Sequence, residues 1–379
     1  SIVADSPRSR ILPGMGDAPA QLENVRRRVV AAIAERGPIT FAEYMELALY
    51  APGGFYDAPP VGAAGHFVTS PHTHEVFARL LADGLSELRE RVDRPGDLRV
   101  VEVGAGDGTL ARQLLGHLAE LPVDYTAVER SEGARALLSE LPVTVTPDLR
   151  EVGPIAGGCV IANELLDNLP FRRVRGSERG PLEIRVGLES SRLVEVETPC
   201  DAELAVLMLD ELAPGSERAI PTGALAFVED VAEVLVDGYA VLIDYEGGRN
   251  DLHGYRGHRV VEVDLDRPGT ADITAGVDLD AVAARAERAG LHVFGTVSQS
   301  DALASLGYER WAIQEREHQG ALLRGSSGLE AVRTWSSRNA AAELVDPAGL
   351  GRLNWLTLAS VGRSAPSWTA DREDGVPPS

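Results

Sequence analysis

The stretch from Leu98 to Leu110, LRVVEVGAGDGTL, constrains the fold more than any other part of this chain. A short apolar run leads into three glycines, and a helical pattern begins at Thr109. An apolar run bounded by turn residues is typical of a buried parallel strand. Glycines at 104, 106 and 108 remove the Cβ atom where a backbone must turn sharply and approach a ligand closely. The stretch therefore predicts a strand, glycine turn and helix in succession.

The neighbouring acids indicate which ligand this turn binds. A second predicted strand, residues 124–128, ends in Glu129, which is placed to accept hydrogen bonds from the two hydroxyls of a ribose. The glycines run G-x-G-x-G, whereas a dinucleotide fingerprint runs G-x-G-x-x-G and directs a helix N-terminus at a pyrophosphate. Glu102, just before the turn, would repel a pyrophosphate but can bind an ammonium group. The pattern favours S-adenosylmethionine, with a dinucleotide or a turn without ligand as the alternatives.

Loops near this turn supply the other predicted cofactor contacts. Thr69 and Ser70 precede a predicted helix over 72–91, where they can cap the helix or bind the carboxylate or methionine part of the cofactor. Asp148 follows a predicted third strand, 143–145, from which it could accept a hydrogen bond from the adenine amino group. The predicted cofactor-binding residues are Thr69, Ser70, Pro71, Glu102, Gly104, Ala105, Gly106, Asp107, Glu129, Arg130, Asp148, Leu149 and Asn163.

The predicted fourth strand, 158–162, ends in a group of polar residues, NELLDNLP. Open α/β sheets bind ligands at the carboxyl ends of their strands, so we expect the chemistry here. The predicted catalytic residues are Glu164 and Asp167, followed by His258. The structural alternatives are that Glu164 bonds a helix N-terminus and that Asp167 bonds a buried amide.

The rest of the chain is divided by changes of pattern. Residues 1–20 lack periodicity and are expected to form a disordered leader. An N-terminal helical region is expected over 21–95, in which Thr40 and Glu43 form a capping box. The core is expected over 96–363, interrupted at about 171–225 by short alternating runs that indicate an antiparallel β insertion. Residues 364–379 are expected to be a disordered tail.

Composition excludes some functions. All 36 residues counted as Lys or Arg are arginine, which excludes a P-loop, Schiff-base or general-base lysine. A net charge of −22 argues against nucleic acid or an anionic membrane as partner, because both are bound by basic patches. Cys159 and Cys200 form no C-x-x-C pair, so neither a disulfide framework nor a metal site is indicated. Without an apolar span or a signal pattern, the protein is expected to be cytoplasmic.

With these segments placed, the chain resembles the MidA-like (DUF185) family of S-adenosylmethionine-dependent methyltransferases. The matching segments are ITFAEYMELALYAPGGFY, GHFVTSP, VVEVGAGDGTL, AVERS, IANELLDNLP, VLIDYEGG, YRGH and ADITAGVDL, which span roughly residues 37–310. The resemblance implies a class I methyltransferase, an α/β protein with a Rossmann-like seven-stranded sheet, a helical N-terminal part and an inserted β region. His66, His72, Asn168 and Glu246 depart from the family pattern around the expected pocket.

Three functions are compatible with these residues. The resemblance implies methylation of a protein arginine, because the mitochondrial member of the family is an arginine methyltransferase acting in complex I assembly. The alternatives are a tailoring methyltransferase for a small molecule or modified peptide, in which a histidine could act as base, and a non-catalytic assembly factor that binds the cofactor. A homodimer is a possible assembly.

Overall fold

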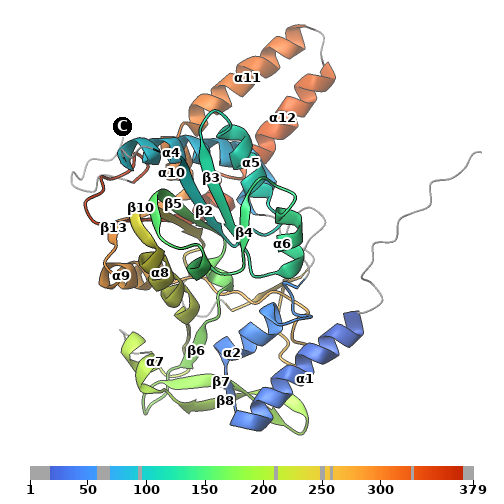
Figure 1. Cartoon of the computed structure of the whole chain (residues 1–379). Helices are drawn as coiled ribbons and strands as arrows, with labels where there is room; N and C mark the ends of the chain where they lie inside the picture. Colours follow the sequence, from blue (N-terminus) through green and yellow to red (C-terminus); the bar gives the residue numbers. More distant parts are fainter. Residues whose placement is uncertain are drawn as a thin grey trace, which may run out of the picture.

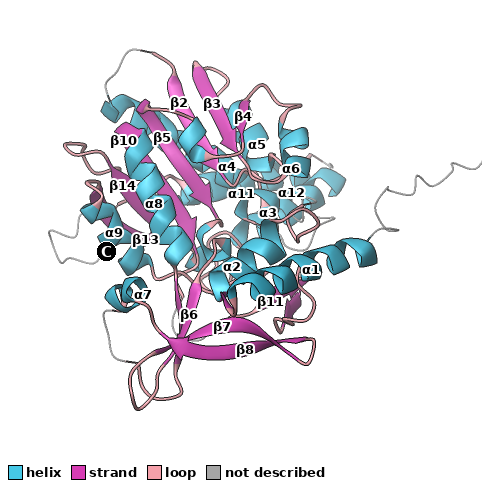
Figure 2. Ribbon diagram, turned by 60° about the horizontal axis from the view of Figure 1, so that its bottom comes forward, coloured by secondary structure: helices cyan, strands magenta, loops and turns pink. Residues whose placement is uncertain are grey.

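The computed structural model describes residues 18–57, 69–92, 96–208, 212–247, 252–256, 259–325 and 328–369. Within these ranges the chain forms two sheets and a short ribbon, with helices packed around them (Figures 1 and 2). No helix in the described ranges has both the length and the apolar character needed to cross a membrane.

The larger sheet has seven strands in the order β13-β14-β10-β5-β2-β3-β4, which confirms the expected class I methyltransferase sheet. Its strands, along the sheet, are β13 (His292–Ser298), β14 (Asn354–Ala359), β10 (Leu235–Asp244), β5 (Ile155–Asn163), β2 (Leu98–Val103), β3 (Val123–Val128) and β4 (Thr144–Thr146). Strands β10, β5, β2, β3 and β4 pair in parallel, whereas β14 runs antiparallel to both of its neighbours.

The register brings the carboxyl ends of the central strands to one edge of the sheet. Val103, the last residue of β2, pairs with Val128 at the end of β3 and with Ala162 near the end of β5. The glycine turn, Glu129 and the polar group after β5 therefore lie side by side, where open parallel sheets bind ligands.

Helices cover both faces of this sheet, so its central strands are buried on both sides. On one face, α4 (Val76–Val92), α5 (Thr109–His117) and α10 (Gln299–Ser305) pack with β2, β5 and β10. On the other face, α8 (Thr222–Val234) and α9 (Leu279–Arg288) form a second apolar cluster with the same strands. In Figure 2, α8 lies across β5 and β10.

The other elements of the core are shorter or lie at its margin. A hairpin of α11 (Tyr308–Arg324) and α12 (Gly328–Ala342) projects from the rest of the molecule in Figure 1. The small elements are α6 (Glu132–Leu138), η2 (Leu149–Glu151), η3 (Leu166–Asn168), η4 (Leu350–Arg352), β11 (Gly254–Arg256) and β12 (Arg259–Val261).

The second sheet is antiparallel and holds the inserted residues. It contains β6 (Arg172–Arg175), β7 (Leu182–Glu189), β8 (Arg192–Pro199) and β9 (Glu217–Ile220), together with β1 (Ile39–Thr40) from the N-terminal part. A short helix, α7 (Ala202–Leu207), follows β8. Both ends of the insertion meet beside the polar group that follows β5, because Gly223 N and Thr222 Oγ1 donate hydrogen bonds to the Pro170 carbonyl, at 2.8 and 3.3 Å.

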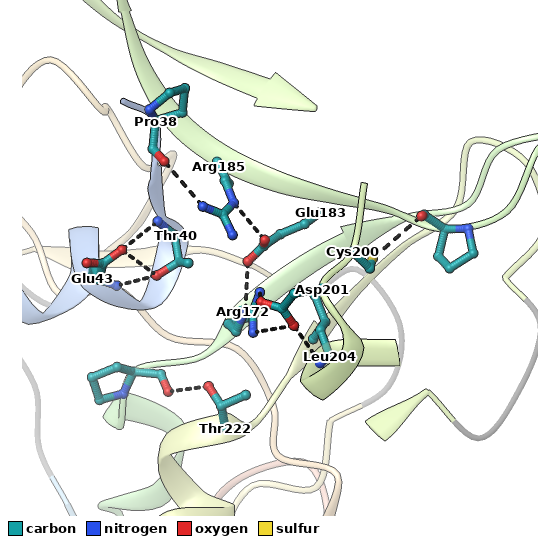
Figure 3. Close-up of polar contacts among 12 residues, drawn as sticks. Pro38, Thr40, Glu43, Arg172, Glu183, Arg185, Cys200, Asp201, Leu204 and Thr222 are labelled. Atoms are coloured by element: carbon teal, nitrogen blue, oxygen red, sulfur yellow. Dashed lines mark hydrogen bonds and ion pairs between the residues drawn. The ribbon is translucent and has the colours of Figure 1, made fainter. Parts of the chain in front are cut away.

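A buried ion-pair network ties the strands of this sheet to α7 (Figure 3). Glu183 on β7 has no exposed surface and accepts hydrogen bonds from Arg172 and Arg185, both at 2.7 Å. Arg172 also contacts Asp201, whose Oδ1 caps α7 through the Leu204 N–H at 2.8 Å. The network therefore holds β6, β7 and α7 of the insertion together.

The N-terminal helices pack on the second sheet. α1 (Ala18–Arg36) ends just before the Gly37-Pro38 pair and begins within the segment expected to be a leader. The capping box is confirmed: Thr40 Oγ1 accepts from Glu43 N at 3.1 Å, and Glu43 Oε2 accepts from Thr40 N at 3.0 Å. The capped helix α2 (Phe41–Met45) continues as a π-helix, η1 (Glu46–Tyr50). These elements bury one apolar cluster against β7 and β8.

The helix expected over 72–91 is interrupted, so that prediction was wrong in part. A short helix, α3 (Ser70–Thr73), ends at His74, whose backbone is extended, and α4 follows from Val76. The His74 side chain explains the break, because Nδ1 accepts a hydrogen bond from Val76 N at 3.0 Å and Nε2 lies 2.6 Å from Ser337 Oγ on α12.

The structure describes residues 364–369 of the segment expected to be a disordered tail, and residues 370–379 lie outside the described residues. Trp368 is buried to 2% exposure, its ring packs against Trp355, and its Nε1 donates to Thr357 Oγ1 at 3.1 Å. A single large aromatic side chain thus fixes a segment whose other residues are mostly polar or proline.

Candidate active site

A pocket of about 450 Å³ lies at the carboxyl ends of β2, β3 and β5. Thirteen of the predicted site residues line it, whereas Ser70 and Asp167 do not, and His258 lies outside the described residues. The thirteen are Thr69, Pro71, Glu102, Gly104, Ala105, Gly106, Asp107, Glu129, Arg130, Asp148, Leu149, Asn163 and Glu164.

The glycine turn adopts a backbone that requires glycine. Gly104, Gly106 and Gly108 have φ values of 74°, 55° and 77°, in the left-handed region that other residues rarely enter. Gly106 also donates its N–H to Glu129 Oε2 at 2.9 Å. The turn therefore joins the tips of β2 and β3 and leaves a strip of bare backbone along the pocket.

Glu129 is held rigidly at the tip of β3. Its Oε1 accepts from Ser131 N at 2.8 Å and its Oε2 from Gly106 N. Each carboxylate oxygen has two lone pairs, so each can accept one further hydrogen bond. The carboxylate is thus prearranged for a ligand with two adjacent hydroxyls, such as a ribose.

Asp148 and Arg150 form an ion pair on the pocket wall after β4. Arg150 donates to both oxygens of Asp148, with Nη2 2.6 Å from Oδ2 and Nε 3.0 Å from Oδ1. The hydrogen bonds from Arg150 lower the pKa of Asp148 to about 2. Asp148 is consequently ionised at neutral pH and remains an acceptor beside the predicted adenine position.

Glu102 is 4% exposed and accepts a hydrogen bond from the Tyr125 hydroxyl at 2.6 Å. Burial raises the pKa of Glu102 to about 8, and the hydrogen bond from Tyr125 opposes part of this rise. The expected binding of an ammonium group by Glu102 needs its ionised form, which a cation placed at the pocket surface would favour.

Thr69 and Ser70 have different surroundings, and the prediction for Ser70 needs correction. Ser70 is fully buried: its N–H donates to Glu164 Oε1 at 2.8 Å, and its hydroxyl contacts Gln299 Oε1 at 3.3 Å. Its side chain therefore holds the loop and does not face the pocket. Thr69 lines the pocket and makes no side-chain capping bond with α3, since its hydroxyl is 2.9 Å from His72 Nδ1.

Glu164 follows β5 and occupies a left-handed backbone position, with φ 52°. Such a conformation is uncommon for a residue with a side chain and occurs often at functional sites. Oε1 accepts from Ser70 N and from Asn163 Nδ2, whereas Oε2 accepts no hydrogen bond from any residue that the structure describes. Burial raises the pKa of Glu164 to about 7. The side chain thus presents one free carboxylate oxygen at the pocket.

Asp167 is not among the residues that line this pocket, and its expected contact with a substrate stays a prediction. Its Oδ2 accepts from Thr274 Oγ1 at 2.8 Å, and its buried Oδ1 has no hydrogen-bond partner among the described residues. Asp244 fixes the adjacent backbone by accepting from Leu166 N at 2.6 Å and from Asp167 N at 3.3 Å. Burial raises the pKa of Asp167.

Sequence reasoning missed two tyrosines from the N-terminal part that line the pocket. Tyr50 and Tyr56 stack with ring centroids 5.4 Å apart, and the Arg130 guanidinium lies 4.3 Å from the Tyr50 centroid. The Tyr50 hydroxyl donates to the Asn168 carbonyl, and the Tyr56 hydroxyl donates to Asp272, both at 2.9 Å. The available signal was the pair of aromatics that flank the Pro-Gly-Gly turn. Glu246 does not line the pocket, and His66 lies outside the described residues.

These residues fit S-adenosylmethionine. Bare backbone adjoins a prearranged acceptor for two hydroxyls, and the buried Asn163 Oδ1, which has no partner among the described residues, can accept from an ammonium group. The sheet order, the left-handed glycine turn and the acid after β3 together define a class I S-adenosylmethionine-dependent methyltransferase.

Comparison with known proteins agrees with this class. A family model described as "Putative S-adenosyl-L-methionine-dependent methyltransferase" matches residues 80–297, and the chain belongs to this family. The curated relatives include the mitochondrial protein arginine methyltransferase NDUFAF7 of Mus musculus, 27% identical over 78% of this chain and 77% of its own. The human protein of that name is 26% identical over 78% of this chain and 76% of its own.

A solved structure is similar over nearly the whole chain. It is a COG1565 superfamily member and likely methyl transferase from Burkholderia thailandensis, bound to S-adenosyl-homocysteine. It is 29% identical, has a TM-score of 0.82, and the match covers 95% of this chain and 98% of that one. The protein is therefore an S-adenosylmethionine-dependent methyltransferase of the MidA-like family.

Proposed function

We propose that the protein N-methylates an arginine side chain of another protein. The observation that carries this proposal is the free Oε2 of Glu164, which a rigid network presents to the cofactor pocket. A carboxylate at this place can bind a positively charged methyl acceptor. The names of the curated relatives support the same substrate class.

The chemistry of the guanidinium group explains why a carboxylate is needed. The group stays protonated in proteins and has no free lone pair, so a carboxylate must localise its charge away from the attacking nitrogen. A bound cation favours the ionised form of Glu164. Because the pKa of Glu164 is about 7, the carboxyl group can ionise at neutral pH. When bound, the cofactor supplies an electrophilic methyl group. Glu164 then holds the guanidinium in line with it and can take up the proton that leaves the methylated nitrogen.

The surroundings of Glu164 are arranged to keep this oxygen in place. Ser70 N and Asn163 Nδ2 both donate to Oε1, and the backbone N–H of Glu164 donates to the Ile243 carbonyl at 2.7 Å. Burial raises the pKa of Glu164 most, the hydrogen bond from Ser70 N lowers it, and the charge of Asp167, three residues further on, raises it. A second buried carboxyl nearby increases the preference of the site for a cation.

The tailoring alternative receives less support from the pocket. It would use a histidine as base, and the pocket contains His72. Both ring nitrogens of His72 are engaged within the protein, at 2.9 Å from Thr69 and 3.0 Å from Asp107. The ring would have to leave one of these partners before it could accept a proton from an acceptor molecule.

The test is incubation of the protein with methyl-labelled S-adenosylmethionine and a lysate of the source cell. After acid hydrolysis of the labelled protein fraction, chromatography separates methylarginine from other methylated residues. Label in methylarginine supports the proposal. Label confined to small molecules or peptides supports the tailoring alternative, and no label at all supports an assembly factor without transfer activity.

A further inference from the structure

The basic side chains that line the pocket are divided between its two ends. Among the described residues that line it, the basic ones are His72, Arg130 and Arg150. Arg130 pairs with Glu46 and stacks on Tyr50, while Arg150 pairs with Asp148. These two arginines follow β3 and β4. His72 is therefore the basic group in this set that lies at the β2 and β5 end.

The strand order tells which part of the cofactor reaches that end. Along the sheet the order is β4, β3, β2 and β5, with the ribose acceptor Glu129 at the tip of β3. The adenine then lies toward β4, and the amino-acid part extends over the tips of β2 and β5. The loop that carries α3 covers this region, because Ser70 N bonds Glu164 after β5 and Gln113 Nε2 on α5 donates to the Pro71 carbonyl at 3.1 Å.

The amino-acid part carries an ammonium and a carboxylate, and these need opposite partners. Glu102 and the Asn163 Oδ1 at this end suit the ammonium. They would repel the carboxylate, which needs a hydrogen-bond donor or a positive charge. Thr69 and His72 line the pocket there, and their side chains carry hydrogen-bond donors.

Thr69, His72 and Asp107 line the pocket, and the His72 ring lies between the other two side chains and contacts both. His72 Nδ1 lies 2.9 Å from Thr69 Oγ1, and Nε2 lies 3.0 Å from Asp107 Oδ2. Thr109 N donates to the other oxygen of Asp107 at 3.0 Å, which fixes the carboxylate on the glycine turn. Burial would raise the pKa of Asp107, but hydrogen bonds from His72 and Thr109 outweigh it and leave that pKa below its usual value.

We propose that His72 is a positioning residue that directs the Thr69 hydroxyl at the α-carboxylate of the cofactor. We assign His72 Nε2 as the donor to Asp107 and His72 Nδ1 as the donor to Thr69 Oγ1, across 3.0 and 2.9 Å. The oxygen of Thr69 is then an acceptor toward the ring, and its own O–H is free to donate to the carboxylate.

The test compares two ligands that differ in whether they carry the amino-acid moiety. S-adenosylhomocysteine carries the amino-acid moiety, whereas 5′-methylthioadenosine keeps the adenine and ribose but lacks the carboxylate and ammonium. Binding of both is measured by calorimetry for the wild type and for Thr69→Val, Thr69→Ser and His72→Ala. His117→Ala, a change of an exposed histidine on α5, serves as the control.

The proposal expects a selective loss. Thr69→Val and His72→Ala should weaken S-adenosylhomocysteine binding at least 10-fold and change 5′-methylthioadenosine binding less than 2-fold. Thr69→Ser, which keeps the hydroxyl, and His117→Ala should retain the affinity for both ligands. Equal losses for the two ligands would overturn the proposal, because Thr69 and His72 would then stabilise the fold or contact the adenine and ribose. Unchanged S-adenosylhomocysteine binding by Thr69→Val would overturn it as well. Neither result depends on the identity of the methyl acceptor.

Discussion

Glu164 Oε1 accepts a hydrogen bond from the backbone N–H of Ser70 at 2.8 Å, across 94 positions of the sequence. This bond joins the loop before α3 to the end of β5, so the N-terminal part of the chain completes the site that the sheet begins. One oxygen of the carboxylate is occupied by this structural role, while the other remains available at the pocket. Glu164 thus holds the loop in place with one oxygen and offers the other oxygen to a ligand.

Gly106→Val should abolish binding of S-adenosylmethionine and of its demethylated product. Gly106 has a left-handed φ that a β-branched residue does not tolerate, and its N–H orients Glu129. Gly116→Val is the matched control, because a Cβ at that exposed helical position meets no atom within 4 Å. Calorimetry on both folded variants provides the measurement. Undiminished binding by Gly106→Val would refute the assignment of this turn to the cofactor.

Glu129→Ala should weaken cofactor binding by ~1–3 kcal/mol, because two ribose hydroxyls lose a charged acceptor. This corresponds to roughly a 5- to 150-fold increase in Kd. Glu132→Ala removes an exposed acid from the first turn of α6 and should leave Kd unchanged. A larger thermal shift of the wild type with NAD than with S-adenosylmethionine would contradict the reading of the whole site.

The stability of the protein should fall as the pH rises from 5 to about 8.5. The pKa of Glu102 is raised to about 8, and those of Glu164 and Asp272 to about 7, in each case chiefly by burial. The folded state therefore binds more protons than the unfolded state over this range, and the contribution to stability is lost as these groups ionise.

Glu102→Gln isolates one of these groups, because the amide oxygen can still accept from Tyr125. At pH 5 the variant and the wild type should have similar unfolding free energies, and at pH 9 the variant should be more stable by about 2–5 kcal/mol. Urea denaturation at both pH values measures the difference. Glu120→Gln, an exposed acid at the end of α5, should show no such divergence. A parallel pH dependence of Glu102→Gln and wild type would show that Glu102 is ionised throughout.

Trp368→Ala should lower the free energy of unfolding by about 3–5 kcal/mol, because a buried indole leaves a cavity and Thr357 loses a hydrogen-bond partner. Val361→Ala changes a side chain that is 82% exposed in the same C-terminal segment and should cost little. Chemical denaturation of the two variants tests the packing of this segment. Equal stability of Trp368→Ala and wild type would show that the segment contributes nothing to the fold.

Sequence patterns predicted the central strands and the glycine turn because each depends on local features. An apolar run between turn residues specifies a parallel strand, and glycine spacing specifies a backbone that only glycine adopts. The break at His74 depends instead on Ser337, more than 260 positions away, and the burial of Trp368 depends on Trp355 and Thr357. Contacts of this kind leave no periodic signal in either segment.

The same distinction applies to the site. Glu129 and Glu164 were placed from the ends of strands, which the topology brings to one edge. Tyr50 and Tyr56 reach that edge from the N-terminal part through tertiary packing, so no local pattern marks them as pocket residues. The prediction for Ser70 was wrong because its hydroxyl turns to Gln299 on α10. The predicted cytoplasmic location stays a prediction.

Glu164→Gln tests the acceptor side of the reaction. Glutamine keeps the shape, and its Oε1 can still accept from Ser70 N, but the charge that holds a cation is lost. If Glu164 holds the guanidinium and takes up its proton, turnover should fall by roughly 10²-fold or more, while the Kd of S-adenosylhomocysteine changes little. Glu246→Gln, at an exposed position just after β10, is the control that removes an acid from the same sheet edge without touching the pocket. Both quantities are measured on each variant, with calorimetry for binding and label transfer for turnover. Equal loss of binding and turnover would indicate that Glu164 contacts the cofactor instead. Full activity would indicate that Glu164 has only a structural role, through its hydrogen bond with Ser70.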